Sequence, residues 1–217
     1  QGVEYYRKAA DRHKEKSLRE RSILKLIETL ERSGAMDEAL KESSVFLGEF
    51  PESAGRPVVY RRAIDSARHL GRHDRALELI ESWRAEGAVP DSTGEISLLK
   101  ARILTEKGRD GEARSELAPF RHTWPSSPLL PEALLLEAGL LRRSGAGREA
   151  AGRLHLALLE EKDEGKRAAI LSSLASICAE DLGDTLSAIM YWETVASIDL
   201  TGLESAEALW KAGLARA

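Results

Sequence analysis

The chain has 217 residues, of which 42% are hydrophobic and 31% are charged, and its formal net charge is −4. This mildly acidic balance argues against a nucleic-acid binder, because phosphate binding needs a strong basic excess. The one cysteine, Cys178, excludes an intrachain disulfide and a zinc site built from several cysteines. No apolar run reaches the roughly 18 residues that a membrane-spanning helix needs, so we expect no direct insertion into a membrane.

A short pattern recurs along the chain, in which an alanine follows a glycine by five residues. Successive glycines of the pattern are separated by 37, 37, 37 and 38 residues. A fixed period of this length is the signature of a solenoid, whose units pack only on their neighbours. The pairs are Gly34 and Ala39, Gly71 and Ala76, Gly108 and Ala113, Gly145 and Ala150, and Gly183 and Ala188.

Each period predicts two amphipathic helices with the glycine between them. In the second period, apolar residues recur at helical spacing before Gly71, and a new apolar stripe begins at Ala76. The small alanine lets the two antiparallel helices approach closely. Strand signals are absent, so the predicted fold is all α. In chain order the paired stripes cover residues 23–30 and 39–50, 58–70 and 76–83, 96–104 and 113–120, 134–141 and 150–157, and 171–178 and 188–195.

We therefore predict one array over residues 1–217, an all-α solenoid of about twelve antiparallel helices. It comprises a half repeat at 1–19, full repeats at 20–56, 57–93, 94–130, 131–168 and 169–205, and a half repeat at 206–217. Neither end shows the polar cap that terminal repeats need, so we expect the chain to be a segment of a longer protein. Apolar residues near the two ends, Tyr5, Tyr6 and Trp210, would allow such a segment to self-associate end to end.

The spacing of small and aromatic residues resembles the tetratricopeptide repeat (TPR), a helix–turn–helix unit of 34 residues in its basic form. This resemblance implies that the array is a right-handed superhelix. Gly71, Ala76 and Trp83 match the order of that repeat, and the three extra residues of each period fall in the loop between repeats. Two of these loops resemble the joint of bacterial envelope TPR proteins, such as outer-membrane-assembly lipoproteins and periplasmic cell-division coordinators. They are Phe50-Pro51-Glu52-Ser53 before Pro57, and Trp124-Pro125-Ser126-Ser127 before Pro131.

The resemblance implies an inner groove lined by the first helix of each repeat, at 13, 10, 6, 3 and 2 residues before the turn glycine. Arginine forks bind carboxylates in pairs of hydrogen bonds, so an acidic extended peptide or a partner's C-terminus is the expected ligand. The alternative is an ordinary charged surface with local ion pairs such as Arg61–Asp65. The expected groove residues are Arg61, Asp65, Arg68, Leu98, Arg102, Leu135 and Arg142, and in repeat two the full set is Val58, Arg61, Asp65, Arg68 and His69.

Other residues with reactive side chains favour structural roles. His69 and His73 have the spacing of two metal ligands on one helix, but Gly71 lies between them and should end that helix. Cys178 lies on an apolar stripe, where a buried and inert thiol is expected. Lys100 and Glu137 replace an apolar residue at equivalent sites of adjacent repeats, so we expect them to form a partly buried ion pair.

These observations predict a non-catalytic scaffold that binds a protein or peptide partner in its groove, with no cofactor and no metal. The joint favours the bacterial periplasm or envelope over the cytoplasm. An alternative is a helical accessory region of a larger enzyme, for example a cell-wall lytic enzyme, whose catalytic domain lies outside the chain. A helical-repeat RNA binder is disfavoured, because such proteins read bases with side chains that recur at fixed positions and the groove set shows no such recurrence.

Overall fold

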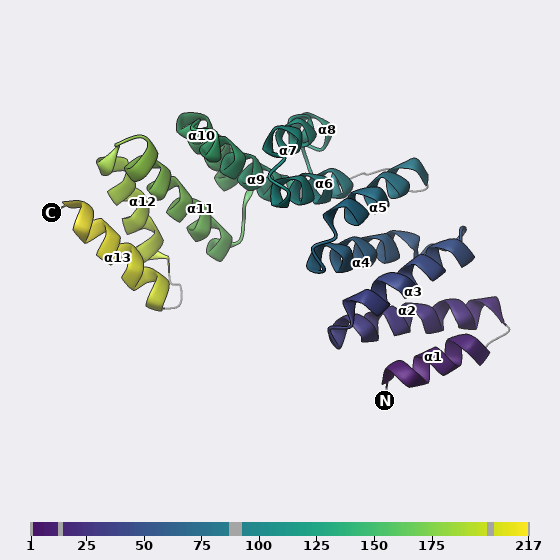
Figure 1. Ribbon diagram of the computed structural model, residues 1–217. Coiled ribbons are helices and arrows are strands. Elements are labelled where there is room, and N and C mark those ends of the chain that lie inside the picture. The colour runs from purple at the N-terminus through teal and green to yellow at the C-terminus, as the bar shows by residue number, and fades with distance from the viewer. Residues whose placement is uncertain (1, 13–14, 87–92, 199–201, 217) are drawn as a thin grey trace. The chain divides into compact units, whose positions relative to one another are not determined.

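A computed structural model describes residues 2–12, 15–86, 93–198 and 202–216, and all regular structure in these residues is helical (Figure 1). The predicted all-α fold is confirmed. The short α8 belongs to the same second helix as α7, and the π turn η1 directly continues α11, which leaves twelve helical rods. The elements are α1 (Gly2–Arg12), α2 (Lys16–Arg32), α3 (Met36–Glu49), α4 (Arg56–His69), α5 (His73–Glu86), α6 (Glu95–Glu106), α7 (Asp110–Leu117), α8 (Phe120–Thr123), α9 (Leu130–Arg143), α10 (Gly147–Glu160), α11 (Glu164–Ser176), η1 (Ile177–Asp181), α12 (Thr185–Ser197) and α13 (Gly202–Arg216).

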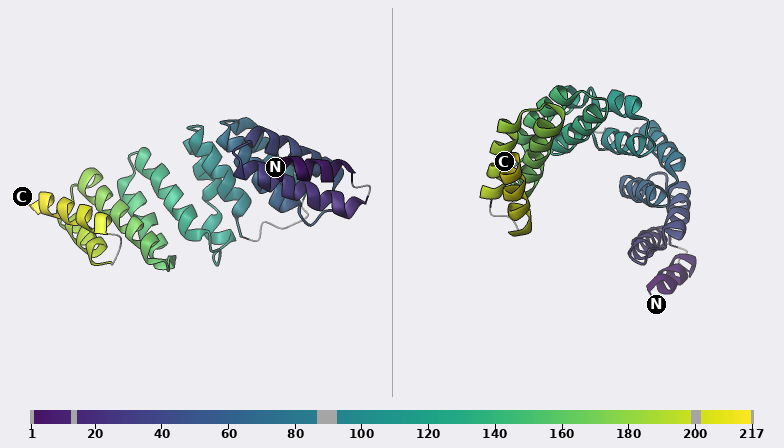
Figure 2. Two further views of the ribbon diagram at one scale, coloured as in Figure 1. Left: turned by 90° about the horizontal axis from the view of Figure 1, so that it is seen from below. Right: turned by 60° about the vertical axis from the view of Figure 1, so that its left-hand side comes forward.

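The contacts divide the chain into two compact units, Gln1–Asp91 and Ser92–Ala217. The division lies close to the predicted border between the second and third repeats, at residues 93 and 94. Within each unit a helix packs on its neighbours in the chain, as expected for a repeat array. Figure 2 shows successive helices of each unit lying side by side and reversing direction at each turn.

The five repeat glycines form the turns that the period predicts. All five have positive φ angles, from +67° at Gly183 to +80° at Gly145, a conformation that a side chain disfavours. In the first four repeats, the amide after the glycine donates to a carbonyl five residues earlier; Arg72 donates to Ala67, for example, over 2.8 Å. This is the hydrogen bond of a Schellman cap, and it fixes the reversal between the two helices of a hairpin.

The alanines that follow these glycines lie where the two helices of a hairpin meet. All five are completely buried. In the first unit, Ala39 of α3 packs with Leu26 and Leu30 of α2. A separate cluster joins apolar side chains from α1 to α4 and so continues from one hairpin to the next. Its larger members include Ile23, Ile27, Phe46, Phe50 and Val59.

The one repeat with a 38-residue spacing contains a π turn. η1 follows α11 without a break, and here the amide of Asp184 donates to Cys178, six residues earlier, over 2.8 Å. A π turn holds one residue more than an α turn. The extra residue of the fifth repeat is therefore absorbed inside its first helix, next to the glycine.

The second helix of repeat three is interrupted, which the periodic pattern does not predict. α7 ends at Leu117, and α8 begins at Phe120 after Pro119. Proline lacks an amide hydrogen and crowds the preceding turn, so it interrupts a helix at this point. Phe120 is still buried and packs against Trp124, with ring centroids 5.0 Å apart.

The two proline-containing joints have the same geometry. Ser53 Oγ accepts a hydrogen bond from the amide of Gly55 at 2.9 Å, and Ser127 Oγ accepts one from Leu129 at 3.0 Å. A proline then occupies the first turn of α4 and of α9, where its missing amide hydrogen costs nothing. The recurring sequence thus has a physical basis, because a serine closes the turn and a proline starts the next helix.

A further recurring contact involves three arginines, here called the joint arginines: Arg19, Arg56 and Arg167. Each lies in the first four residues of the first helix of a repeat and donates to carbonyls at the end of the preceding repeat's second helix. Arg56 Nη1 reaches the carbonyl oxygens of Leu47 at 2.5 Å and Phe50 at 3.1 Å. Arg19 donates to Ala10, and Arg167 donates to Leu158 and Glu161. The joint arginines therefore satisfy carbonyls that the ends of helices leave without an intrahelical partner.

Arg56 also holds the second helix of its own repeat. Its guanidinium donates twice to the carboxylate of Glu86, through Nε at 2.9 Å and through Nη2, and the Tyr60 hydroxyl donates to the same carboxylate. The hydrogen bond from Arg56 lowers the pKa of Glu86, whereas burial and the contact with Glu86 raise the pKa of Tyr60 to about 12. The Tyr60 ring stacks on Trp83, with centroids 5.8 Å apart. Arg19 makes the equivalent pair of hydrogen bonds to Glu49, both at 2.8 Å.

Candidate functional site

A hollow of about 450 Å³ opens on the first unit, and we call it the α4 hollow. It lies beside α4, and the neighbouring hairpin of repeat one supplies its other wall. Its lining contains the complete groove set of repeat two: Val58, Arg61, Asp65, Arg68 and His69. The remaining lining residues are Glu31, Met36, Arg62 and Ser66.

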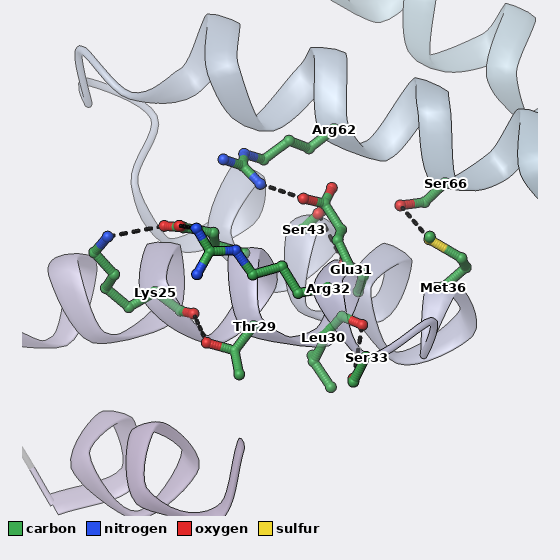
Figure 3. A network of polar contacts seen from close by, with 12 residues as sticks. Lys25, Thr29, Leu30, Glu31, Arg32, Ser33, Met36, Ser43, Arg62 and Ser66 are labelled. Atoms are coloured by element: carbon green, nitrogen blue, oxygen red, sulfur yellow. Dashed lines mark hydrogen bonds and ion pairs between the residues drawn. The ribbon is translucent and has the colours of Figure 1, made fainter. Parts of the chain in front are cut away.

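The wall between repeats one and two is held by polar contacts (Figure 3). Arg62 of α4 forms an ion pair with Glu31 of α2, and Ser66 Oγ lies 3.9 Å from Met36 Sδ. Burial raises the pKa of Glu31 in spite of the nearby Arg62 guanidinium. Because α2, α3 and α4 all contribute to these contacts, the shape of the hollow depends on the packing of one hairpin against the next.

The α4 hollow is mixed in charge, with an excess of arginine. Three arginines and two carboxylates line it. One pair within it is loose, because Arg68 lies 3.7 Å from Asp65 and both side chains are partly exposed. A solvent-exposed pair of this kind contributes about 0–1 kcal/mol.

The groove residues of the second unit are in different surroundings. Arg102 forms an ion pair with Glu132 of the next repeat. Arg142 is held by two acidic residues of η1, with Glu180 at 2.7 Å and Asp181 at 2.6 Å. Leu98 is buried and Leu135 is partly buried. These ion pairs join adjacent repeats, and they give Arg102 and Arg142 carboxylate partners.

Lys100 and Glu137, which the sequence predicts to pair with each other, each form an ion pair within their own hairpin. Lys100 Nζ lies 3.4 Å from Glu116, and Glu137 lies 2.8 Å from Arg153 Nε. Both partners stand eight residues after the turn glycine, on the second helix of the same hairpin. The positions eight residues before and eight residues after the turn glycine thus face each other within a hairpin. In repeat three the first position is basic and the second acidic, and in repeat four the order is reversed.

The histidines and the cysteine have the surroundings that the sequence predicts. His69 ends α4 and His73 begins α5, so the two lie on different helices with Gly71 between them. Cys178 is buried, and burial raises the pKa of its thiol. Among the described residues, no group of three or more His, Cys, Asp or Glu side chains is arranged to hold a metal ion. None of the described helices combines the length and the apolar character needed to cross a membrane.

Sequence reasoning missed three residues of the α4 hollow and the joint arginines, whereas Glu31 stands three residues before Gly34, at a groove position of repeat one. Met36 enters the hollow because the neighbouring hairpin packs beside α4, which a single-repeat pattern does not show. Arg62 and Ser66 lie on α4 itself, each one residue after a groove position. A signal for the joint arginines is present, since Arg19 and Arg56 are separated by the repeat period of 37 residues.

No protein-family model matches the chain. No curated protein matches it either.

Solved structures of helical-repeat proteins match nearly the whole chain. YrrB, a TPR protein with an unusual peptide-binding site, is 13% identical with a TM-score of 0.61, over 96% of this chain and 99% of that one. A thermophilic TPR protein of Thermus thermophilus is 18% identical with a TM-score of 0.58, over 91% and 98%. PilW, a type IV pilus biogenesis factor, is 16% identical with a TM-score of 0.63, over 91% and 89%. The chain therefore has the TPR fold, as its repeat pattern predicts.

Proposed function

We propose that this TPR-fold chain is a non-catalytic scaffold that binds a segment of a partner protein in the α4 hollow. One observation carries the proposal: all five groove positions of repeat two line a single hollow together with residues of the preceding hairpin. A concave surface built on packed helices is rigid, so a peptide that binds there loses its own freedom without having to order the scaffold.

The lining of the α4 hollow favours an acidic segment that also carries an apolar side chain. Arg61 and Arg68 offer guanidinium groups, which bind carboxylates with paired, charge-assisted hydrogen bonds. Val58 and Met36 add apolar surface, and the Val58 side chain is well exposed. A carboxylate next to a leucine-sized side chain satisfies both features.

We also propose a bacterial envelope setting. The Phe50-Pro51-Glu52-Ser53 joint resembles that of envelope TPR proteins, and one structural neighbour, PilW, is a pilus biogenesis factor. Fractionation of cells that express the complete protein tests this setting. We expect the protein in the envelope fractions, and recovery in the cytosol alone would contradict the proposal.

Binding is tested with a fluorescein-labelled synthetic peptide of alternating glutamate and leucine. We compare the unaltered chain, an Arg61→Glu and Arg68→Glu double variant, and an Arg75→Glu and Arg84→Glu control. The control makes the same change in charge on α5, outside the α4 hollow.

We expect the groove variant to bind at least ten times more weakly, and the control to change the affinity less than threefold. Equal weakening of both variants would show that overall charge, and not the α4 hollow, holds the peptide.

A further inference from the structure

The last full repeat exposes apolar side chains on its second helix. Leu186 and Met190 of α12 are one helical turn apart and are 78% and 67% exposed. Leu182, just before the helix, is 40% exposed. We call Leu186 and Met190 the α12 ridge; α12 is labelled in Figure 1.

The exposure of the α12 ridge follows from its position in the repeat. Leu186 and Met190 stand three and seven residues after the turn glycine. The equivalent residues of the first four repeats are exposed too, although each of those repeats has another repeat after it. In those repeats the two positions hold only polar, charged or glycine residues: Asp37 and Lys41, Asp74 and Glu78, Gly111 and Ser115, and Arg148 and Gly152.

The fifth repeat also differs from the others in charge. The sequence has no lysine or arginine from residue 168 to residue 210, and this stretch contains seven acidic residues. Two of them, Asp184 and Glu193, flank the α12 ridge along the chain and are exposed. The ridge is thus an apolar strip in an acidic segment.

We propose that the α12 ridge docks a basic amphipathic helix of a partner protein. Leucine-sized side chains four residues apart on such a helix can pack along Leu186 and Met190, as in other helix-to-helix recognition. Lysine or arginine beside them meets Asp184 and Glu193, and this complementary charge steers the encounter. A second copy pairing through the same ridge brings equal acidic charge together, and anionic lipid is repelled in the same way.

This surface is separate from the α4 hollow. The ridge lies on a second helix of the second unit, whereas the hollow is lined by α4 and its neighbours in the first unit. A scaffold with both surfaces can hold two different segments at once. Failure of either proposal leaves the other standing.

The test uses a labelled 18-residue peptide of leucine and lysine arranged as an amphipathic helix. Its controls are a scrambled peptide of the same composition and a leucine–glutamate peptide with the same pattern. The protein variant is Leu186→Asp with Met190→Lys, which installs the residues of repeat one and leaves the net charge unchanged. Leu159→Ser serves as a matched control, because Leu159 is 79% exposed on α10.

We expect the amphipathic basic peptide to bind the unaltered chain and Leu159→Ser alike, and the double variant at least ten times more weakly. The scrambled and acidic peptides should bind at least ten times more weakly than the basic one. Equal affinity for the unaltered chain and the double variant would overturn the proposal, since charge alone would then explain binding. Two further results would also overturn it: self-association that the double variant abolishes, or ridge-dependent binding to phosphatidylglycerol vesicles.

Discussion

Replacing Arg56 by methionine should lower the free energy of unfolding by about 2–3 kcal/mol. Methionine keeps an apolar stem of similar length and removes only the guanidinium. The change removes the Arg56 donor from the carbonyls of Leu47 and Phe50, of which the second still accepts from the Ser53 amide, and it leaves Glu86 without its cation. Removing one partner of a buried pair costs about 3–5 kcal/mol. We expect a loss at or just below the lower end of that range, because the Glu86 side chain is 28% exposed and water can reach it.

Arg19→Met supplies the matched comparison. Arg19 makes the same kinds of contact, to Ala10 and Glu49, but its side chain is 29% exposed against 11% for Arg56. We therefore expect a smaller loss, about 1 kcal/mol. Urea unfolding of the full chain, followed by circular dichroism, measures both values. A double-mutant cycle with Glu86→Gln should show coupling between Arg56 and Glu86. A loss below about 0.5 kcal/mol for Arg56→Met, or an equal loss for both variants, would refute the idea that burial makes this joint strong.

Three further changes test the turns, the hairpin contacts and the buried hydroxyl. Ala76→Leu should destabilise the chain by about 1–3 kcal/mol, because Ala76 is completely buried where two helices meet; unchanged urea unfolding would contradict that packing. Gly71→Ala should lower the free energy of unfolding by about 1–2 kcal/mol, since the φ angle of Gly71 is +68°. Gly48→Ala inside α3 should not destabilise the chain, and thermal unfolding compares the two variants. The Tyr60 contacts should stabilise the fold fully below pH 10 and be lost between pH 10 and 12, because its pKa rises from 10 to about 12 on folding. Tyrosinate absorbance should therefore show a late step that Tyr60→Phe removes, and a step near pH 10 in its place would refute the network.

The features set by local sequence were the ones that could be predicted. Each hairpin needs a glycine where φ is positive and a small residue where its two helices cross. Because both needs recur in every hairpin, the repeat period identifies the turns and the buried alanines. The groove set of repeat two came from the family resemblance, and the structure brings those five residues around one hollow.

The features that depend on which side chains face each other could not be predicted in the same way. Lys100 pairs with Glu116 because positions before and after the turn meet within a hairpin, which the sequence spacing does not state. The 38-residue spacing signalled an extra residue but not its conformation, and the structure places it in a π turn. Pro119 signals the break between α7 and α8, but a proline at this position is not part of the repeat pattern.

Chemical-shift mapping of the isotope-labelled chain with the glutamate–leucine peptide tests the binding account most directly. The account predicts saturable shifts at the amides of Glu31, Arg61, Asp65 and Arg68, in α2 and α4, with the solvent-facing side of α5 unchanged. Shifts spread evenly over the chain, or gathered on α5 away from the α4 hollow, would contradict it.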